Sequence, residues 1–214
     1  MNYLAHLFLA DDTAESRIGN MLGDFVTPET ELQFSPEIRK GIALHRAVDK
    51  FTDSHPVFLR SKSRISDDFR LLKGIMIDIF YDHFLAKNWE NYADQPLELF
   101  AEEVYRQFSN HFEMLPPRMQ HMMPVMIRGN WLVTYREIRG IAWVLKGMSG
   151  RISRPEYFTS RDTLTHRKIC RVRNRFCGIF CGAATIRQGC EARVVNFCKI
   201  LIYRLFSRNQ SSIL

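Results

Sequence analysis

Residues 36–54 read PEIRKGIALHRAVDKFTDS. Four of these side chains recur every three or four positions: Ile38, Ile42, His45 and Asp49. This is the spacing of one face of an α-helix. Ser35-Pro36 is typical of an N-cap followed by proline at the first helical position, and His55-Pro56 is typical of a boundary. The segment therefore predicts a helix that presents a histidine and an aspartate about 40° apart on one face.

The sequence that follows continues this helical period. We expect three further helices, over residues 67–85, 97–115 and 131–146. Pro116-Pro117 is expected to start a Met-rich helix, which Pro124 must bend. No run before residue 150 alternates between apolar and polar side chains as a half-buried strand does. The chain is therefore predicted to be all-α.

The size and composition of the chain are those of a globular protein. Its 214 residues, 46% of them apolar, allow one domain with a buried core, which we assign to residues 1–155. No apolar run approaches the roughly 20 residues needed to cross a bilayer. The opening MNYLAHLFLA is apolar, but it lacks a basic n-region and contains His6, so a secretory signal is not expected. These features favour a cytoplasmic enzyme without stable membrane insertion.

The last part of the chain differs from the rest in charge and cysteine content. Residues 1–158 contain 19 Lys and Arg against 21 Asp and Glu, whereas residues 159–214 contain 11 against 2. All five cysteines lie in this second part, without paired CxxC motifs, and His166 alone does not complete a zinc site. We therefore expect residues 156–214 to form a basic, cysteine-rich tail and not a domain.

A change of reading frame in the gene would explain this abrupt switch. If residues from Glu156 onward are reverse-translated and the frame moves forward by one base, every cysteine codon gives Ala or Val. Arginine codons can then give acidic residues. One permitted reading is an acidic amphipathic segment that ends in a stop codon opposite Val195-Asn196. The alternative is a genuine basic tail that binds nucleic acid or an anionic membrane.

Six side chains in the helical part are candidates for a hydrolytic metal site: His6, Asp24, His45, Asp49, Asp82 and His83. Imidazole and carboxylate together suit a divalent transition metal, which can activate water near neutral pH. Carboxylates inside the apolar run of residues 75–85 are costly unless they are paired or bound to a metal. The six residues therefore predict a metal centre more strongly than any of them does alone.

Each of these residues also has a simpler explanation. His6 lies among leucines, as core histidines do, and His45 with Asp49 could be a surface pair. Asp24 follows Gly19-Asn20 and Gly23 in a segment that predicts turns, so it could be a helix cap. Arg46 is either a side chain that binds phosphate or an exposed arginine.

Five segments resemble the acyl carrier protein phosphodiesterase family, also called ACP hydrolase. They are MNYLAHL at the start, GNMLGDFV at 19–26, GIALHRAVDKFTD at 41–53, IMIDIFYDHFLAKNW at 75–89, and WLVTYR with VLKGM within 131–148. These segments span nearly all of residues 1–150 in the order found in the family. The resemblance implies an HD-like helical domain, because the family is a distorted branch of the HD metal-dependent phosphohydrolases.

The resemblance also implies an activity. Such an enzyme hydrolyses the phosphodiester between 4′-phosphopantetheine and the serine of holo-acyl carrier protein, in the cofactor turnover of lipid synthesis. The family is associated with manganese. By position, Asp24, His45, Asp82 and His83 would form or border the metal site, and His6 and Asp49 would be further ligands or orienting residues. Arg46 would assist at the phosphate.

The implied partner is holo-acyl carrier protein, a small acidic protein that basic surface residues could steer: Arg39, Lys40, Lys62 and Arg64. No nucleic acid partner is expected on this reading. Two alternatives remain open from the residues alone. One is an HD-like phosphohydrolase acting on a nucleotide or another small phosphate ester. The other is a non-catalytic helical protein whose basic tail binds a membrane or RNA.

Overall fold

The structure, a computed structural model, describes residues 3–65, 67, 73–141 and 144. The chain divides into two compact units, residues 1–137 and 138–214. Within the described residues all regular structure is helical and no strand occurs, which confirms the predicted all-α fold. The predicted domain boundary at residue 155 and the tail over 156–214 lie outside the described residues.

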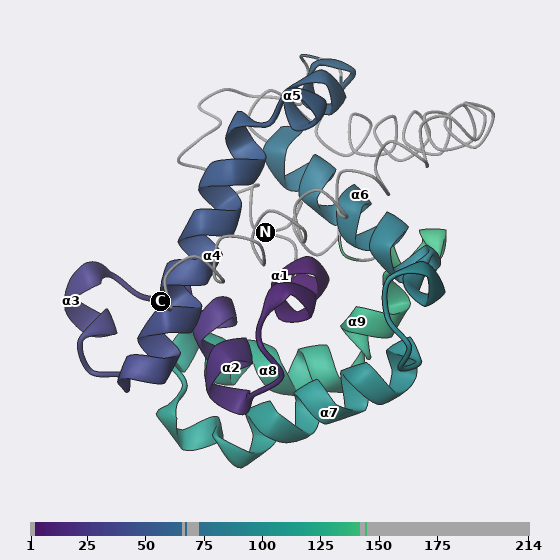
Figure 1. The fold of residues 1–214 in the computed structure, drawn as a ribbon. Helices are drawn as coiled ribbons and strands as arrows, with labels where there is room; N and C mark the ends of the chain where they lie inside the picture. Colours follow the sequence, from purple (N-terminus) through teal and green to yellow (C-terminus); the bar gives the residue numbers. More distant parts are fainter. Residues whose placement is uncertain (1–2, 66, 68–72, 142–143, 145–214) are drawn as a thin grey trace, which may run out of the picture. The chain divides into compact units, whose positions relative to one another are not determined.

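The first unit is a set of helices joined by short connections (Figure 1). In chain order its α-helices are α1 (Tyr3–Leu9), α2 (Ala14–Leu22), α3 (Pro28–Glu31), α4 (Pro36–Ser54), α5 (Pro56–Ser63), α6 (Lys73–Lys87), α7 (Leu97–Asn110), α8 (Pro117–Arg128) and α9 (Trp131–Thr134). Two 3-10 turns, η2 (Trp89–Asn91) and η3 (Phe112–Met114), flank α7. Leucine, isoleucine and methionine side chains from most of these helices form the buried core.

The closest helix packing joins α2 and α4, and glycines make it possible. A Cβ atom on Gly19 would overlap the carbonyl oxygen of Ile38 and lie 2.9 Å from the Cα of Gly41. A Cβ atom on Gly41 would lie 2.6 Å from the carbonyl oxygen of Ser16. Since real side chains do not tolerate such distances, only glycine allows the two backbones to approach this closely.

The N-terminal helix is attached to α6 by a buried carboxylate. The backbone N–H groups of Leu4 and Ala5 donate to the two oxygens of Asp82, each at 2.9 Å. These N–H groups have no partner within their own helix, because the first turn of a helix leaves its donors free. Asp82 is fully buried and so fixes the start of α1 against α6.

A second buried charge joins α2 to α7. The guanidinium of Arg17 donates to Glu103 at 3.0 Å and to Gln107 at 3.1 Å, and it lies 5.1 Å from the ring centroid of Phe100. Arg17 is 4% exposed, so these contacts satisfy a charge that would be costly to bury alone. This cluster fixes the face of α2 that does not pack on α4.

The observed boundaries confirm most of the helices predicted around α4. The helix α4 begins at Pro36, with the Ser35 hydroxyl accepting from the Ile38 N–H at 3.4 Å, and ends at Ser54 before His55. The helix α7 ends at Asn110, and η3 replaces the rest of the segment predicted to reach residue 115. The helix α6 is predicted to start at Asp67-Asp68, and because residues 68–72 lie outside the described residues this start stays a prediction.

Two predictions were wrong in detail. The segment around Gly19 is helical to Leu22, because its glycine serves a helix contact and not a turn. The helix predicted over 131–146 is interrupted by a turn at residues 135–137. The carbonyl oxygen of Tyr135 accepts from Nδ1 of His83 at 2.7 Å, so this buried carbonyl takes a side-chain donor instead of a helical one.

Within the part of the chain that the structure describes, no helix combines the length and apolar character required to span a bilayer.

Candidate functional site

His6 of α1 and His45 and Asp49 of α4 converge on one point. Each offers one ligating atom, and these atoms all lie within 4.8 Å of one another. The Asp49 carboxylate contacts both imidazoles. Its Oδ1 is 3.1 Å from Nε2 of His6, and its Oδ2 is 3.1 Å from Nε2 of His45. Among the described residues, this is the group of histidine and acidic side chains with the geometry to hold a metal ion.

Asp24 approaches the same group from the turn after α2. Its Oδ1 lies 3.5 Å from Nε2 of His45. The preceding Gly23 makes room for this arrangement, since a Cβ atom there would overlap the imidazole ring of His45. The α2–α4 crossing therefore brings the Asp24 carboxylate and the His45 imidazole to the same place. We call His6, Asp24, His45 and Asp49 the histidine–aspartate cluster.

The histidines of this cluster are buried and its carboxylates are open to solvent. The side chains of His6 and His45 are 2% and 4% exposed, and those of Asp24 and Asp49 are 29% and 49% exposed. The two imidazole rings stack with centroids 4.0 Å apart and planes 19° apart. The cluster is therefore accessible from the carboxylate side.

Charges within the cluster shift the protonation of its members. Burial alone would lower the pKa of His45, but hydrogen bonds to Asp24 and Asp49 outweigh it and raise this pKa to about 9. Burial alone would raise the pKa of Asp49, but its bonds to His45 and His6 hold that pKa well below the usual range. Without a metal, a proton on His45 therefore offsets the two carboxylates near neutral pH.

The donor set fits a divalent transition metal. Two imidazole nitrogens and one or two carboxylates are the ligands that such ions take in hydrolytic sites. The Nδ1 atom of His6 lies 2.9 Å from the Oδ1 atom of Asn20, which is the contact a metal-ligating histidine makes with its second nitrogen. His6, His45 and Asp49 would hold the ion, and Asp24 lies within reach as a further ligand.

The structure gives Asp82 and His83 other contacts. Both oxygens of Asp82 accept the backbone N–H groups at the start of α1, and His83 donates to the carbonyl of Tyr135. Neither belongs to the group whose ligating atoms converge. Burial raises the pKa of Asp82 to about 7 despite its two N–H donors. Asp82 thus supports the helix that carries His6.

Arg46, predicted as a phosphate contact, forms an ion pair in this structure. Its Nη1 lies 2.6 Å from Oε2 of Glu31, and its side chain is 44% exposed. The guanidinium of Arg46 therefore faces α3. A phosphate would therefore compete with Glu31 for this guanidinium or share it.

Sequence reasoning missed Asn20 and Gly23. Asn20 was grouped with the surrounding glycines as part of a turn, and its amide was given no role. A usable signal was present, since Gly19 and Gly23 are four apart, as are Asn20 and Asp24, and positions four apart share a face of a helix. This spacing indicates a helix contact at these positions only once the partner helix, α4, is known.

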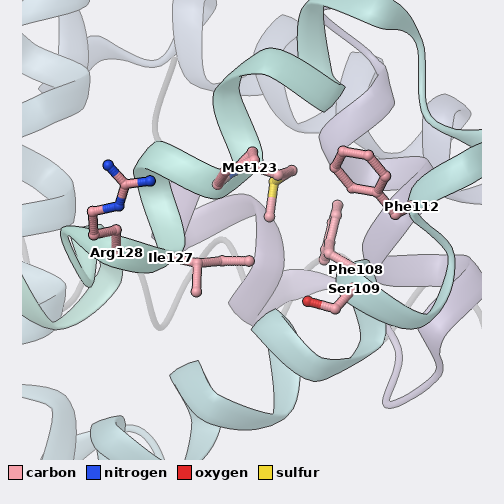
Figure 2. A pocket seen from close by; sticks show the side chains of 7 residues that line it. Phe108, Ser109, Phe112, Met123, Ile127 and Arg128 are labelled. Carbon is pink, nitrogen blue, oxygen red and sulfur yellow. The ribbon is translucent and has the colours of Figure 1, made fainter.

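A separate apolar pocket of about 290 Å³ lies between α7 and α8. Figure 2 shows Phe108 and Phe112 across from Met123 and Ile127, with Arg128 at one end. The remaining lining residues are Ser109 and Pro124. Because no histidine or carboxylate lines it, this pocket lacks the groups that hydrolysis requires, and the histidine–aspartate cluster is the better candidate.

The chain is similar to a known protein family and to several of its members. The family model described as acyl carrier protein phosphodiesterase matches residues 1–180. The acyl carrier protein phosphodiesterase of Photorhabdus laumondii is 38% identical over 152 residues, covering 71% of this chain and 77% of the relative. The Yersinia enterocolitica protein of the same name is 39% identical over 152 residues, covering 71% and 79%.

The corresponding protein of Escherichia coli O45:K1 is 35% identical over 164 residues, covering 76% of this chain and 84% of the relative. No solved structure matches the chain significantly. The family match extends over most of the chain, and the identities hold over most of each relative. The chain therefore belongs to the acyl carrier protein phosphodiesterase family.

Proposed function

We propose that this protein hydrolyses the phosphodiester that joins 4′-phosphopantetheine to the serine of holo-acyl carrier protein. The products are apo-acyl carrier protein and 4′-phosphopantetheine. The observation that carries the proposal is the convergence of His6, His45 and Asp49 in a chain of this family. The relatives named above carry the same activity in their names.

The chemistry divides between a bound ion and the side chains. A divalent ion supplies Lewis-acid polarisation of the phosphoryl group and makes water more acidic. Water forms the new bond to phosphorus, the bond from phosphorus to the serine oxygen breaks, and that oxygen takes a proton. Asp49 aligns the two buried imidazoles, since each of its oxygens faces one of them. The exposed edge of Asp24 and Asp49 is where the diester arrives.

Manganese is the ion we propose, since the resemblance implies it and the donor set suits it. Calcium prefers sites made wholly of oxygen ligands, and here two donors are imidazole nitrogens. Magnesium likewise favours oxygen ligands and retains several waters. The nitrogen content of the cluster therefore favours manganese over both.

The proposed partner is acidic, so a basic surface near the cluster would speed its approach. Lys40 of α4 and Arg64 after α5 are exposed, and Lys62 of α5 is half-buried. We propose that these side chains steer the carrier protein. The proposed compartment is the cytoplasm, where carrier proteins for lipid synthesis would be met.

Intact mass spectrometry of holo-acyl carrier protein tests the function. Incubation with the full chain and manganese should remove the mass of the phosphopantetheine arm, while a nucleotide diester under the same conditions should stay intact. Unchanged holo-protein at high enzyme concentration would rule out the proposed substrate. EDTA should stop release, and manganese should restore it better than calcium. Undiminished release after exhaustive chelation would rule out the metal.

A further inference from the structure

Asn20 is a fully buried amide that contacts the candidate site. It lies on α2 with 0% of its surface exposed. Its Oδ1 is 2.9 Å from Nδ1 of His6, and its Nδ2 has no hydrogen-bond partner among the described residues. Burying an amide with an unpaired N–H donor lowers the stability of the fold, so stability alone does not explain an asparagine at this position.

The backbone at Asn20 has little freedom to move. A Cβ atom on Gly41 would lie 2.9 Å from the backbone nitrogen of Asn20, so α4 packs directly against this turn of α2. The same two helices carry Asp24, His45 and Asp49 or lead into them. The amide oxygen is therefore held at a fixed place relative to the carboxylate on the other side of His6.

His6 lies between these two fixed groups. Nδ1 contacts Asn20 and Nε2 contacts Asp49 at 3.1 Å. An amide oxygen accepts only, so Nδ1 carries the proton in the contact with Asn20, and Nε2 is the nitrogen left to face Asp49. A metal ion bound at Nε2 would take the place of the proton shared between Nε2 and the Asp49 carboxylate.

His45 depends on the same arrangement. Its Nδ1 is buried without a hydrogen-bond partner among the described residues, so no acceptor orients the ring from behind. Its orientation comes from the contacts of Nε2 with Asp24 and Asp49, from Gly23 on one side and from stacking on His6 at 4.0 Å. A ring of His6 that turned would therefore remove a support of His45 as well.

We propose that Asn20 is a positioning residue for the metal centre. Its amide oxygen accepts the Nδ1–H of His6, directs Nε2 to the ion and fixes the stack of the two imidazoles. This inference rests on the proposed function for the identity of the ion. It does not need the substrate, because the binding of Mn²⁺ itself is the quantity that Asn20 controls.

Two variants separate this role from a purely structural one. Asn20→Leu has a similar shape and no acceptor, and it should weaken Mn²⁺ binding by about 10- to 100-fold, the usual effect of losing such a support. Asn20→Asp keeps an acceptor but buries a charge. It should lower the melting temperature more than Asn20→Leu does, yet bind Mn²⁺ at least as tightly as the wild type. Gln107→Leu, which removes a buried amide from α7, should destabilise without changing Mn²⁺ affinity.

Titration of the full chain with Mn²⁺, followed by electron paramagnetic resonance of the free ion, gives the affinities. Unchanged affinity in Asn20→Leu, or equal losses in Asn20→Leu and Asn20→Asp, would overturn the proposal. If the variants do not fold, the position of the ring proton of His6 in the wild type tests the proposal instead. Nitrogen-15 spectra of the Zn²⁺-loaded protein should show His6 protonated at Nδ1, in slow exchange with water. A proton on Nε2 would overturn the proposal, whereas absence of holo-acyl carrier protein cleavage would contradict only the proposed function.

Discussion

At the scale of single residues, Asp49 has the most direct influence on the candidate site. One carboxylate contacts both imidazoles, one through each oxygen, while its side chain remains 49% exposed. The His45–Asp49 pair was predictable, because residues four apart on a helix share a face. The contact with His6 was not, since it depends on how α1 is placed by Asp82, 78 positions from Leu4.

Removing a side chain of the cluster should stop catalysis without unfolding the protein. We expect Asp49→Ala and His45→Ala each to reduce release of phosphopantetheine at least about a hundredfold, since each removes a direct metal contact. Asp53→Ala, an exposed aspartate one turn further on α4, is the matched control and should retain activity. Mass spectrometry of the carrier protein measures release. Full activity in either cluster variant would contradict the assignment.

Asp82 should make stability depend on pH. Burial raises its pKa to about 7 in the folded protein, from 3.8 when unfolded. The folded state therefore holds the proton more tightly, and the contribution of Asp82 to stability is largest below pH 3.8 and declines as the pH rises towards 7. The Asp82→Asn variant has no proton to lose here and would lack this decline. Urea denaturation at pH 5 and pH 7.5 should give a larger difference for the wild type than for the variant.

The sequence-based view of Asp82 as a metal ligand is tested by the same variant. The amide that Asp82→Asn introduces can still accept one N–H from α1, so Mn²⁺ affinity should fall only modestly if the residue acts through that helix. Asp82→Ala leaves both N–H groups buried without an acceptor and should cost about 1–3 kcal/mol of stability. Equal pH profiles for wild type and Asp82→Asn would instead mean that the carboxylate stays ionised in the fold.

At the scale of helices, the crossing of α2 and α4 determines the site. The helix α4 was predictable with its boundaries, because its cap, its proline and its apolar spacing all agree. The helix α2 was not, because local rules assign glycine to turns, and only the partner helix explains why Gly19 lies within a helix. Periodicity thus identifies elements, whereas the placement of His6 and Asp24 depends on contacts between them.

Gly19→Ala should disrupt this crossing. The new Cβ would overlap the Ile38 carbonyl oxygen, so the helices must separate, with a typical overpacking cost of about 1–3 kcal/mol or more. Gly74→Ala in α6 is the control, since nothing lies within 4 Å of its added Cβ. It should be neutral or stabilise by up to about 1 kcal/mol. Thermal melts measure both, and a Gly19→Ala protein as stable as Gly74→Ala would contradict the packing argument.

At the scale of the whole chain, the family match ends at a different residue from the one at which the composition changes. The family model reaches residue 180, while the change to basic, cysteine-rich sequence begins near residue 156. The family match therefore overlaps the start of the region, residues 156–214, over which the frame-change hypothesis and a genuine tail make different predictions. The tail lies outside the described residues, so both readings stay predictions.

A one-base correction near codon 155 tests the hypothesis. We expect the corrected gene to give a shorter and less basic protein with a higher melting temperature, because an acidic amphipathic helix would cover apolar surface at about 25 cal/mol per Å². Differential scanning calorimetry of both proteins measures this. Deletion of 156–214 should leave the activity of the remaining chain unchanged. If deletion lowers activity or the melting temperature, the tail is a true structural part.

The histidine–aspartate cluster lies wholly between residues 6 and 49. The four side chains of the cluster are therefore encoded in the first quarter of the gene. Most lesions further downstream leave these side chains in place and act on how long the folded protein survives, whereas Asp82 also positions His6. Substitutions at buried core positions after codon 49 should accordingly give temperature-sensitive alleles, active in cool-grown cells and lost to proteolysis in warm ones, whereas substitutions of the cluster side chains should remove activity at either temperature.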